Sequence, residues 1–170
     1  MRKLLLLVSM CVAIAGTVAV SADADTLSFT LIAPGPLSIS TPGGDVALGS
    51  QVSANVATTI SGQLGTVTVS DERGGVRTWV ASVIATSFTP VPTGTAIAAS
   101  AISYSAGPLT FFGLASGTAV AAPGLSGVSP VVNGASTGSG TVSWNPTISV
   151  AVPADFAAGV YTSTITHSVA

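Results

Sequence analysis

The chain has 170 residues, of which only 6% are charged. From Asp25 onward it holds two arginines against five acidic residues and no lysine, which gives a formal net charge of −3. Such a surface cannot hold phosphate polymers by releasing their counterions, so nucleic acid is excluded as a partner. The one cysteine, Cys11, lies near the N-terminus, so a disulfide framework is excluded as well.

The first 24 residues have the three-part layout of a secretory signal peptide. Arg2 and Lys3 precede an apolar run over residues 4–15, and the small residues at 22–24 predict cleavage after Ala24. The run is short for a membrane span, and no second basic cluster follows it. We therefore expect a mature chain, residues 25–170, that is secreted and carries no transmembrane anchor.

Apolar and polar side chains alternate through the first half of the mature chain, and no segment has a convincing helical period. Residues 71–75, Asp-Glu-Arg-Gly-Gly, follow one alternating run and predict a hairpin turn, because the glycines can supply positive φ. Residues 45–61 are small and polar, and predict an irregular excursion or a poor strand. The alternating runs of this half are residues 27–31, 37–39, 64–70 and 77–85.

Alternation is clearest in the second half, over residues 141–152. The last run, residues 160–169, places His167 on the same face as Tyr161, and we expect that face to be buried. Residues 117–140 are rich in Gly, Ser and Ala, and predict long loops around one short strand. Several half-buried strands separated by Gly and Pro predict an all-β fold, an antiparallel β-sandwich of the immunoglobulin-like, Greek-key type, in one domain.

Side chains that could carry catalysis are few. His167 is the only histidine; it could serve a serine nucleophile as base, but its parity favours a hydrogen-bonded core histidine. Asp71 and Glu72 could form a carboxylate pair for glycoside hydrolysis or hold a weak calcium ion, but adjacent residues usually point apart and a solvated turn is the simpler interpretation. We predict no enzyme activity, no cofactor and no metal site.

The two tryptophans, Trp79 and Trp144, both lie inside alternating runs. This position favours a place in the core for each. An exposed ring could instead stack on a sugar or fill a pocket of a partner protein.

The order of several motifs resembles a WxL domain. Residues 64–74 (LGTVTVSDERG), then 78–81 (TWVA) and 87–89 (SFT), resemble its first half, and residues 158–169 resemble its close. Trp79 keeps the first aromatic of the family. Ala81 stands at the expected leucine, and His167 and Val169 stand where a second Trp-x-Leu is expected.

This resemblance, which spans residues 64–170, implies a β-sandwich that attaches exported proteins to the Gram-positive cell wall without a covalent bond, through peptidoglycan. A second hypothesis is a secreted structural protein that pairs with itself or another exported protein through strand edges or loops, because few charges protect its edges. The third, an enzyme acting on wall sugars, requires Asp71, Glu72 and His167 to converge on one cleft. The candidate binding residues are Trp79, Asp71, Arg73, Arg77 and His167.

Overall fold

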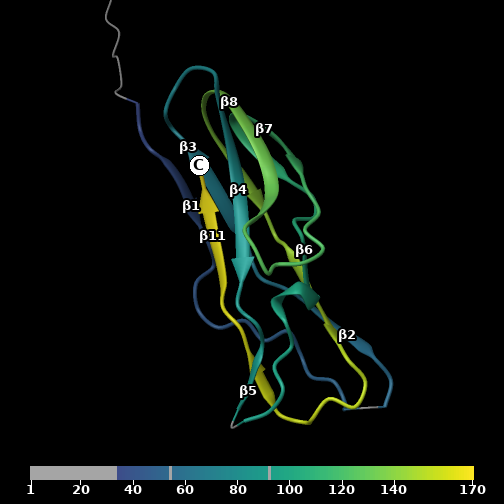
Figure 1. Ribbon diagram of the computed structural model, residues 1–170. Helices are drawn as coiled ribbons and strands as arrows, with labels where there is room; N and C mark the ends of the chain where they lie inside the picture. Colours follow the sequence, from purple (N-terminus) through teal and green to yellow (C-terminus); the bar gives the residue numbers. More distant parts are fainter. Residues whose placement is uncertain (1–33, 54, 92) are drawn as a thin grey trace, which may run out of the picture. The chain divides into compact units, whose positions relative to one another are not determined.

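The computed structural model describes residues 34–53, 55–91 and 93–170 (Figure 1). The predicted signal peptide and the alternating run at residues 27–31 lie outside the described residues. All of these described residues belong to one compact unit. Its elements in chain order are β1 (Leu37–Ser40), β2 (Thr58–Gln63), β3 (Val67–Asp71), β4 (Arg77–Ala85), β5 (Thr89–Val91), the 3₁₀ turn η1 (Ala99–Ala101), β6 (Ile102–Ser105), β7 (Thr110–Ala119), β8 (Ser129–Trp144), β9 (Thr147–Val152), β10 (Val160–Thr162) and β11 (Ile165–Val169).

Every strand pair in the described part is antiparallel. The largest sheet has the order β1-β3-β8-β4-β11, with β7 also paired to β8. A second sheet has the order β2-β9-β6, and β5 pairs with β10. The predicted all-β antiparallel sandwich is confirmed.

β8 joins most of the large sheet. β4 pairs with its first part, from Ser129 to Ser136, and β3 pairs with its last part, from Gly140 to Trp144. β3 and β4 therefore both pair with β8 and not with each other, so the hairpin predicted at residues 71–75 is wrong. The positive φ predicted for the glycines of this connection is confirmed, since Gly74 and Gly75 both have a φ of 70°.

The strands of the large sheet continue into the smaller one across a shared break. β9 follows β8 after Asn145-Pro146, and β2 and β6 flank β9 much as β3 and β7 flank the end of β8. Proline has no N–H for a ladder, so it ends the pairing here. The Asn145 side chain bridges the break, because its Oδ1 accepts from the Gly65 N–H at 3.0 Å and its Nδ2 donates to Gln63 Oε1 at 2.9 Å.

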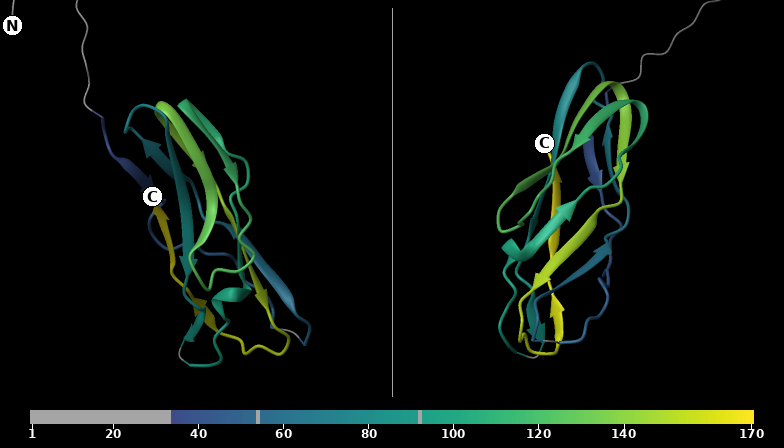
Figure 2. Two further views of the ribbon diagram at one scale, coloured as in Figure 1. Left: turned by 45° about the horizontal axis from the view of Figure 1, so that its top comes forward. Right: turned by 90° about the vertical axis from the view of Figure 1, so that its right-hand side faces the viewer.

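The run predicted over residues 141–152 is therefore two strands with one parity. Val142 and Trp144 before the break, and Ile148 and Val150 after it, are all buried. Figure 2 shows β2, β6 and β9 continuing away from the larger sheet.

The loops predicted over residues 117–140 are wrong, because much of this segment is strand: β7 reaches Ala119 and β8 begins at Ser129. A Cβ on Gly134 would overlap the ring of Trp79, and a Cβ on Gly140 would lie 2.8 Å from that of Ala115. The small residues of β8 thus allow close packing of a central strand.

The core lies between the inward faces of β3, β4, β6, β8 and β9. Burial of apolar surface at about 25 cal/mol per Å² is the main force that holds such layers together. The most buried residues of the core include Val67, Val69, Ala81, Val83, Ile102, Val131, Val132, Val142 and Ile148.

Candidate functional site

Trp79 lies on β4 inside the core and is 2% exposed. Trp144 at the end of β8 is also 2% exposed. The core position that the alternation favours is confirmed for both tryptophans. In this structure the ring of Trp79 packs on the backbone at Gly134, so it offers no open face on which a sugar could stack.

Asp71 ends β3 and is 1% exposed. Arg73 donates from its Nε to Asp71 Oδ1 at 2.9 Å and from its second terminal nitrogen, Nη2, to Asp71 Oδ2 at 3.0 Å. The same Nη2 donates to the carbonyl of Thr78 at 3.1 Å, so the guanidinium ties the end of β3 to the start of β4. These hydrogen bonds from Arg73 lower the pKa of the Asp71 carboxyl, which keeps it ionised.

This ion pair corrects the solvated turn expected for Asp71. Glu72 is exposed while Asp71 is buried, so the two adjacent acids point apart as predicted. Because both Asp71 oxygens already accept from Arg73, this carboxylate fits a structural role and not that of a proton donor or a metal ligand.

His167 on β11 belongs to a chain of hydrogen bonds across the core. Trp144 Nε1 donates to Tyr104 Oη at 2.8 Å, and Tyr104 Oη lies 3.1 Å from His167 Nε2. A neutral His167 with its proton on Nδ1 can accept a hydrogen bond from the Tyr104 hydroxyl at Nε2, so the Trp144 N–H, the Tyr104 hydroxyl and His167 Nε2 are all paired. The hydrogen bond predicted for His167 is confirmed, but the buried core position is not, because His167 is half-buried at the margin of the core.

Burial sets the charge states of this chain. It lowers the pKa of His167, and it raises the pKa of Tyr104 to about 12. Both groups are therefore neutral near pH 7. Among the hydrogen bonds of the described residues, Tyr104 is the partner of His167, so the imidazole has no carboxylate to orient it as in a catalytic triad.

The five predicted binding residues thus take different places. Trp79 and Asp71 are buried, Arg73 is held by Asp71, and His167 is half-buried against Tyr104. Arg77, at the start of β4, is exposed. In the ranges that the structure describes, no group of three or more His, Cys, Asp or Glu could hold a metal ion.

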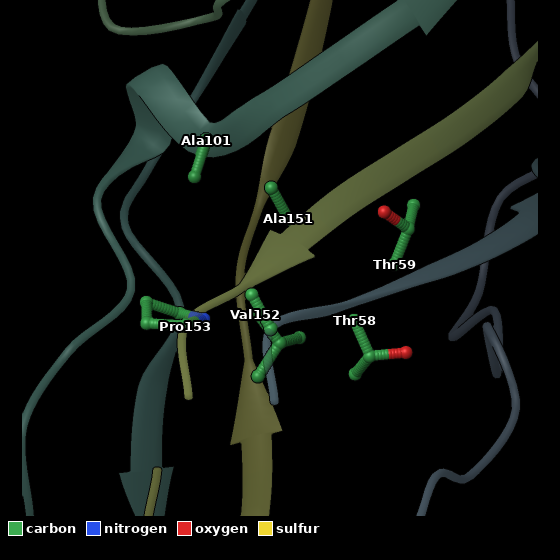
Figure 3. A pocket seen from close by; sticks show the side chains of 7 residues that line it. Thr58, Thr59, Ala101, Ala151, Val152 and Pro153 are labelled. Atoms are coloured by element: carbon green, nitrogen blue, oxygen red, sulfur yellow. The ribbon is translucent and has the colours of Figure 1, made fainter. Parts of the chain in front are cut away.

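A shallow hollow of about 380 Å³ lies over the ends of β2 and β9 (Figure 3). Thr58 and Thr59 supply the side-chain hydroxyls of this hollow, and none of the described residues that line it has a titratable side chain. The hollow can offer a few hydrogen bonds but no acid–base chemistry. Its other lining residues are Ala57, Ala101, Ala151, Val152 and Pro153.

A larger groove, of about 850 Å³, lies beside β9, and we call it the β9 groove. Its volume falls in the range of small-molecule sites. Asp45 is the one charged residue among the described residues that line it. The apolar lining includes Ile60, Phe88, Ile97, Ile148, Val150 and Ile165, and the residues with hydroxyl or amide groups include Ser50, Gln51, Ser53, Thr162, Ser163 and Thr164.

One side of the β9 groove is formed by the β1–β2 connection, residues 41–53 and 55–57. Leu48 packs against β2 at Gly62, where an added Cβ would lie 3.2 Å from Leu48 Cα. Ser53 Oγ donates to the carbonyl of Phe156 at 2.6 Å, which ties this connection to the segment before β10. Long connections of this kind are commonly functional in compact domains.

Three aromatic residues, Phe88, Phe156 and Tyr161, are among those that line the groove. The rings of Phe156 and Tyr161 have centroids 5.9 Å apart and are tilted by 44°. Tyr161 Oη donates to the carbonyl of Ala157 at 2.9 Å, which fixes the direction of its ring. The groove can therefore take an uncharged ligand that has both apolar faces and hydrogen-bonding groups.

The sequence-based choice of binding residues missed this groove. Its one signal was the small, polar stretch within residues 45–61, which we predicted as an irregular excursion or a poor strand. The stretch contains both, since an irregular part precedes β2. Tyr161 was expected on a buried face, and it is half-buried.

Comparison with known proteins found no matching family model, curated protein or solved structure. Membership of the WxL family therefore stays a prediction that rests on the motif order. Within the described ranges there is no helix with the length and hydropathy to cross a membrane.

Proposed function

We propose that this chain is a secreted, non-catalytic cell-surface protein that binds the glycan strands of Gram-positive peptidoglycan in the β9 groove. One observation carries the proposal: the groove combines an apolar floor, hydroxyl groups and aromatic rings, and Asp45 is the one charged residue among the described residues that line it. The predicted signal peptide and the WxL-like motif order support the cell wall as the place of binding.

The chemistry of wall sugars fits such a groove. Sugar rings present C–H faces that pack on aromatic rings such as Tyr161, and their hydroxyls pair with groups such as Ser53 and Thr162. The acetamide methyl of an N-acetylated sugar suits the apolar floor. None of these contacts requires a charge on the protein.

A non-catalytic role is supported by the engaged state of the acid–base groups. Asp71 is held by Arg73, and His167 is paired with Tyr104. Neither group is placed by these contacts beside a second carboxylate, as glycoside hydrolysis needs.

Sedimentation with purified peptidoglycan tests the proposal. The secreted protein should pellet with the wall material to a similar extent at low and high salt, because uncharged contacts are hardly screened. Tyr161→Ala should weaken binding about tenfold through the loss of ring packing, whereas Tyr161→Phe should keep most of it. Full recovery of the wild-type protein in the supernatant at both salt concentrations would contradict wall binding.

A matched control locates the site. Val76→Ala removes an exposed apolar side chain from the β3–β4 connection, whose residues do not line the groove, and should leave sedimentation unchanged. If Val76→Ala weakens binding and Tyr161→Ala does not, the glycan does not bind in the β9 groove.

A further inference from the structure

β7 is an edge strand of the largest sheet. Among the described strands it pairs with β8 alone, so its other edge presents backbone N–H and C=O groups that no described strand covers. The strand has 10 residues, which is long for an edge. A long edge of this kind is a template for adding a further strand.

Large apolar side chains surround this edge. Phe111 is 46% exposed, Phe112 is 78% exposed and Leu114 is 61% exposed. Phe111 lies opposite Val142 and Phe112 opposite Thr141, so the two rings stand on opposite faces of the sheet. A strand added at this edge would therefore contact an apolar ring on each face.

The edge lacks the charges that usually protect such strands. No Asp, Glu, Lys, Arg or His occurs between Arg77 and Asp155, a stretch that contains all of β7 and its neighbour β8. The one protective feature on β7 is a bulge between Gly113 and Ala115, where Gly113 has a φ of 71°. The bulge divides the edge into two parts but leaves Phe111 and Phe112 uncovered.

We propose that β7 pairs in antiparallel fashion with β7 of a second copy, which forms a two-fold symmetric dimer. An edge without charges cannot attract a charged strand by electrostatics. β7 of a second copy is equally uncharged, so no charge repulsion opposes its pairing with this edge. Antiparallel pairing of two identical strands closes on itself, so each copy covers the Phe111, Phe112 and Leu114 side chains of the other. This inference is independent of the β9 groove.

The exposed area sets the expected strength. The full accessible area of an aromatic residue is about 200 Å², and that of leucine is somewhat less. Multiplied by the exposed fractions of Phe111, Phe112 and Leu114, these areas give about 350 Å² of exposed surface per copy. A standard stable interface buries about 800 Å² per partner. We therefore expect a weak dimer with a dissociation constant in the micromolar range.

Sedimentation velocity over a concentration series tests the proposal with the secreted protein. The wild-type protein should pass from monomer to dimer in the micromolar range, and Phe112→Lys should raise the dissociation constant at least tenfold by placing like charges at the edge. The control Val91→Lys adds the same charge on β5, where Val91 is 59% exposed, and should leave the dimer intact. Thermal unfolding of each variant checks that it is folded.

A strict monomer at several hundred micromolar would overturn the proposal, and so would a dimer that Phe112→Lys does not weaken. A series of larger oligomers would also overturn it, because such a series indicates head-to-tail contacts, which do not close into a dimer. Hydrogen exchange on the wild-type protein gives a test that needs no variant. Amides of β7 should exchange more slowly at high protein concentration than at low, and equal rates would also refute the pairing.

Discussion

The part of the molecule built on β3, β4 and β8 is packed more tightly than the part built around β9. In the first part, Val67, Ala81 and Val132 are fully buried, and the backbone at Gly134 touches the ring of Trp79. In the second part, Ile102 and Ile148 are fully buried as well, but the inward-facing residues of β2 and β10 are only half-buried, and the β9 groove lies among them.

The difference arises from what covers each sheet and not from the strands themselves. The chain continues from β8 into β9 across Asn145-Pro146 with its parity unchanged. Strands cover both edges of β8 and both edges of β9, but the β1–β2 connection, which has no regular structure, lines one side of the groove beside β9. A rigid sheet that carries an adaptable irregular segment is a common arrangement for binding sites.

Gly134→Ala should have the largest effect, because it tests the tight part directly. The added methyl group would overlap the Trp79 ring, and relief requires the ring or β8 to move. We expect a loss of about 3 kcal/mol in the free energy of unfolding, measured by urea denaturation. Gly127→Ala is the control, since nothing lies within 4 Å of a Cβ there, and it should change stability by less than about 0.5 kcal/mol. Equal stability of the two variants would show that the tight packing is absent.

The tightly packed part built on β3, β4 and β8 was also easier to predict from the sequence, although the prediction failed for the first part of β8. β4 has the bounds 77–85 expected from its alternation, because one of its faces is buried and the other is not. The first part of β8, up to Gly140, lies in the segment predicted as long loops around one short strand, because its glycines and serines carry no apolar period. The glycines of β8 are needed because Trp79 and β7 approach its backbone closely. These contacts join residues that are far apart in the sequence.

The candidate site could not be predicted for a related reason. The β9 groove is built from segments around Ser53, Ile60, Ile148 and Tyr161, which only the folded chain brings together. None of them carries a catalytic or metal-binding motif. Charged and aromatic residues are scarce in this sequence, which made Asp71 and Trp79 candidates for a binding site. In the structure Trp79 packs in the core, and Asp71 holds the β3–β4 connection through Arg73.

A smaller effect should come from the hydrogen-bond chain that ends at His167. Burial lowers the pKa of His167 in the folded protein below its ordinary value of 6.5, so the unfolded chain binds a proton more readily. The resulting stability is fully present above about pH 6.5 and is lost as pH falls toward the folded-state pKa. Urea denaturation at pH 7.5 and 5.5 should show a loss for the wild-type protein and a smaller loss for His167→Gln. The same loss in both proteins would show that His167 is not the group that titrates.

Ser53→Ala should have the smallest effect on stability and the most local one. It removes the hydrogen bond to the carbonyl of Phe156, which ties the β1–β2 connection across the groove. Because this contact lies in the exposed part, the free energy of unfolding should change by no more than about 0.5 kcal/mol. Amides of the connection should nevertheless exchange faster with deuterium, while those of β8 keep their rates. Ser50→Ala, in the same connection, is the control and should not alter exchange. A loss of stability comparable to that of Gly134→Ala would mean that the groove is as tightly coupled to the core as β8 is, and the contrast between the two parts would fail.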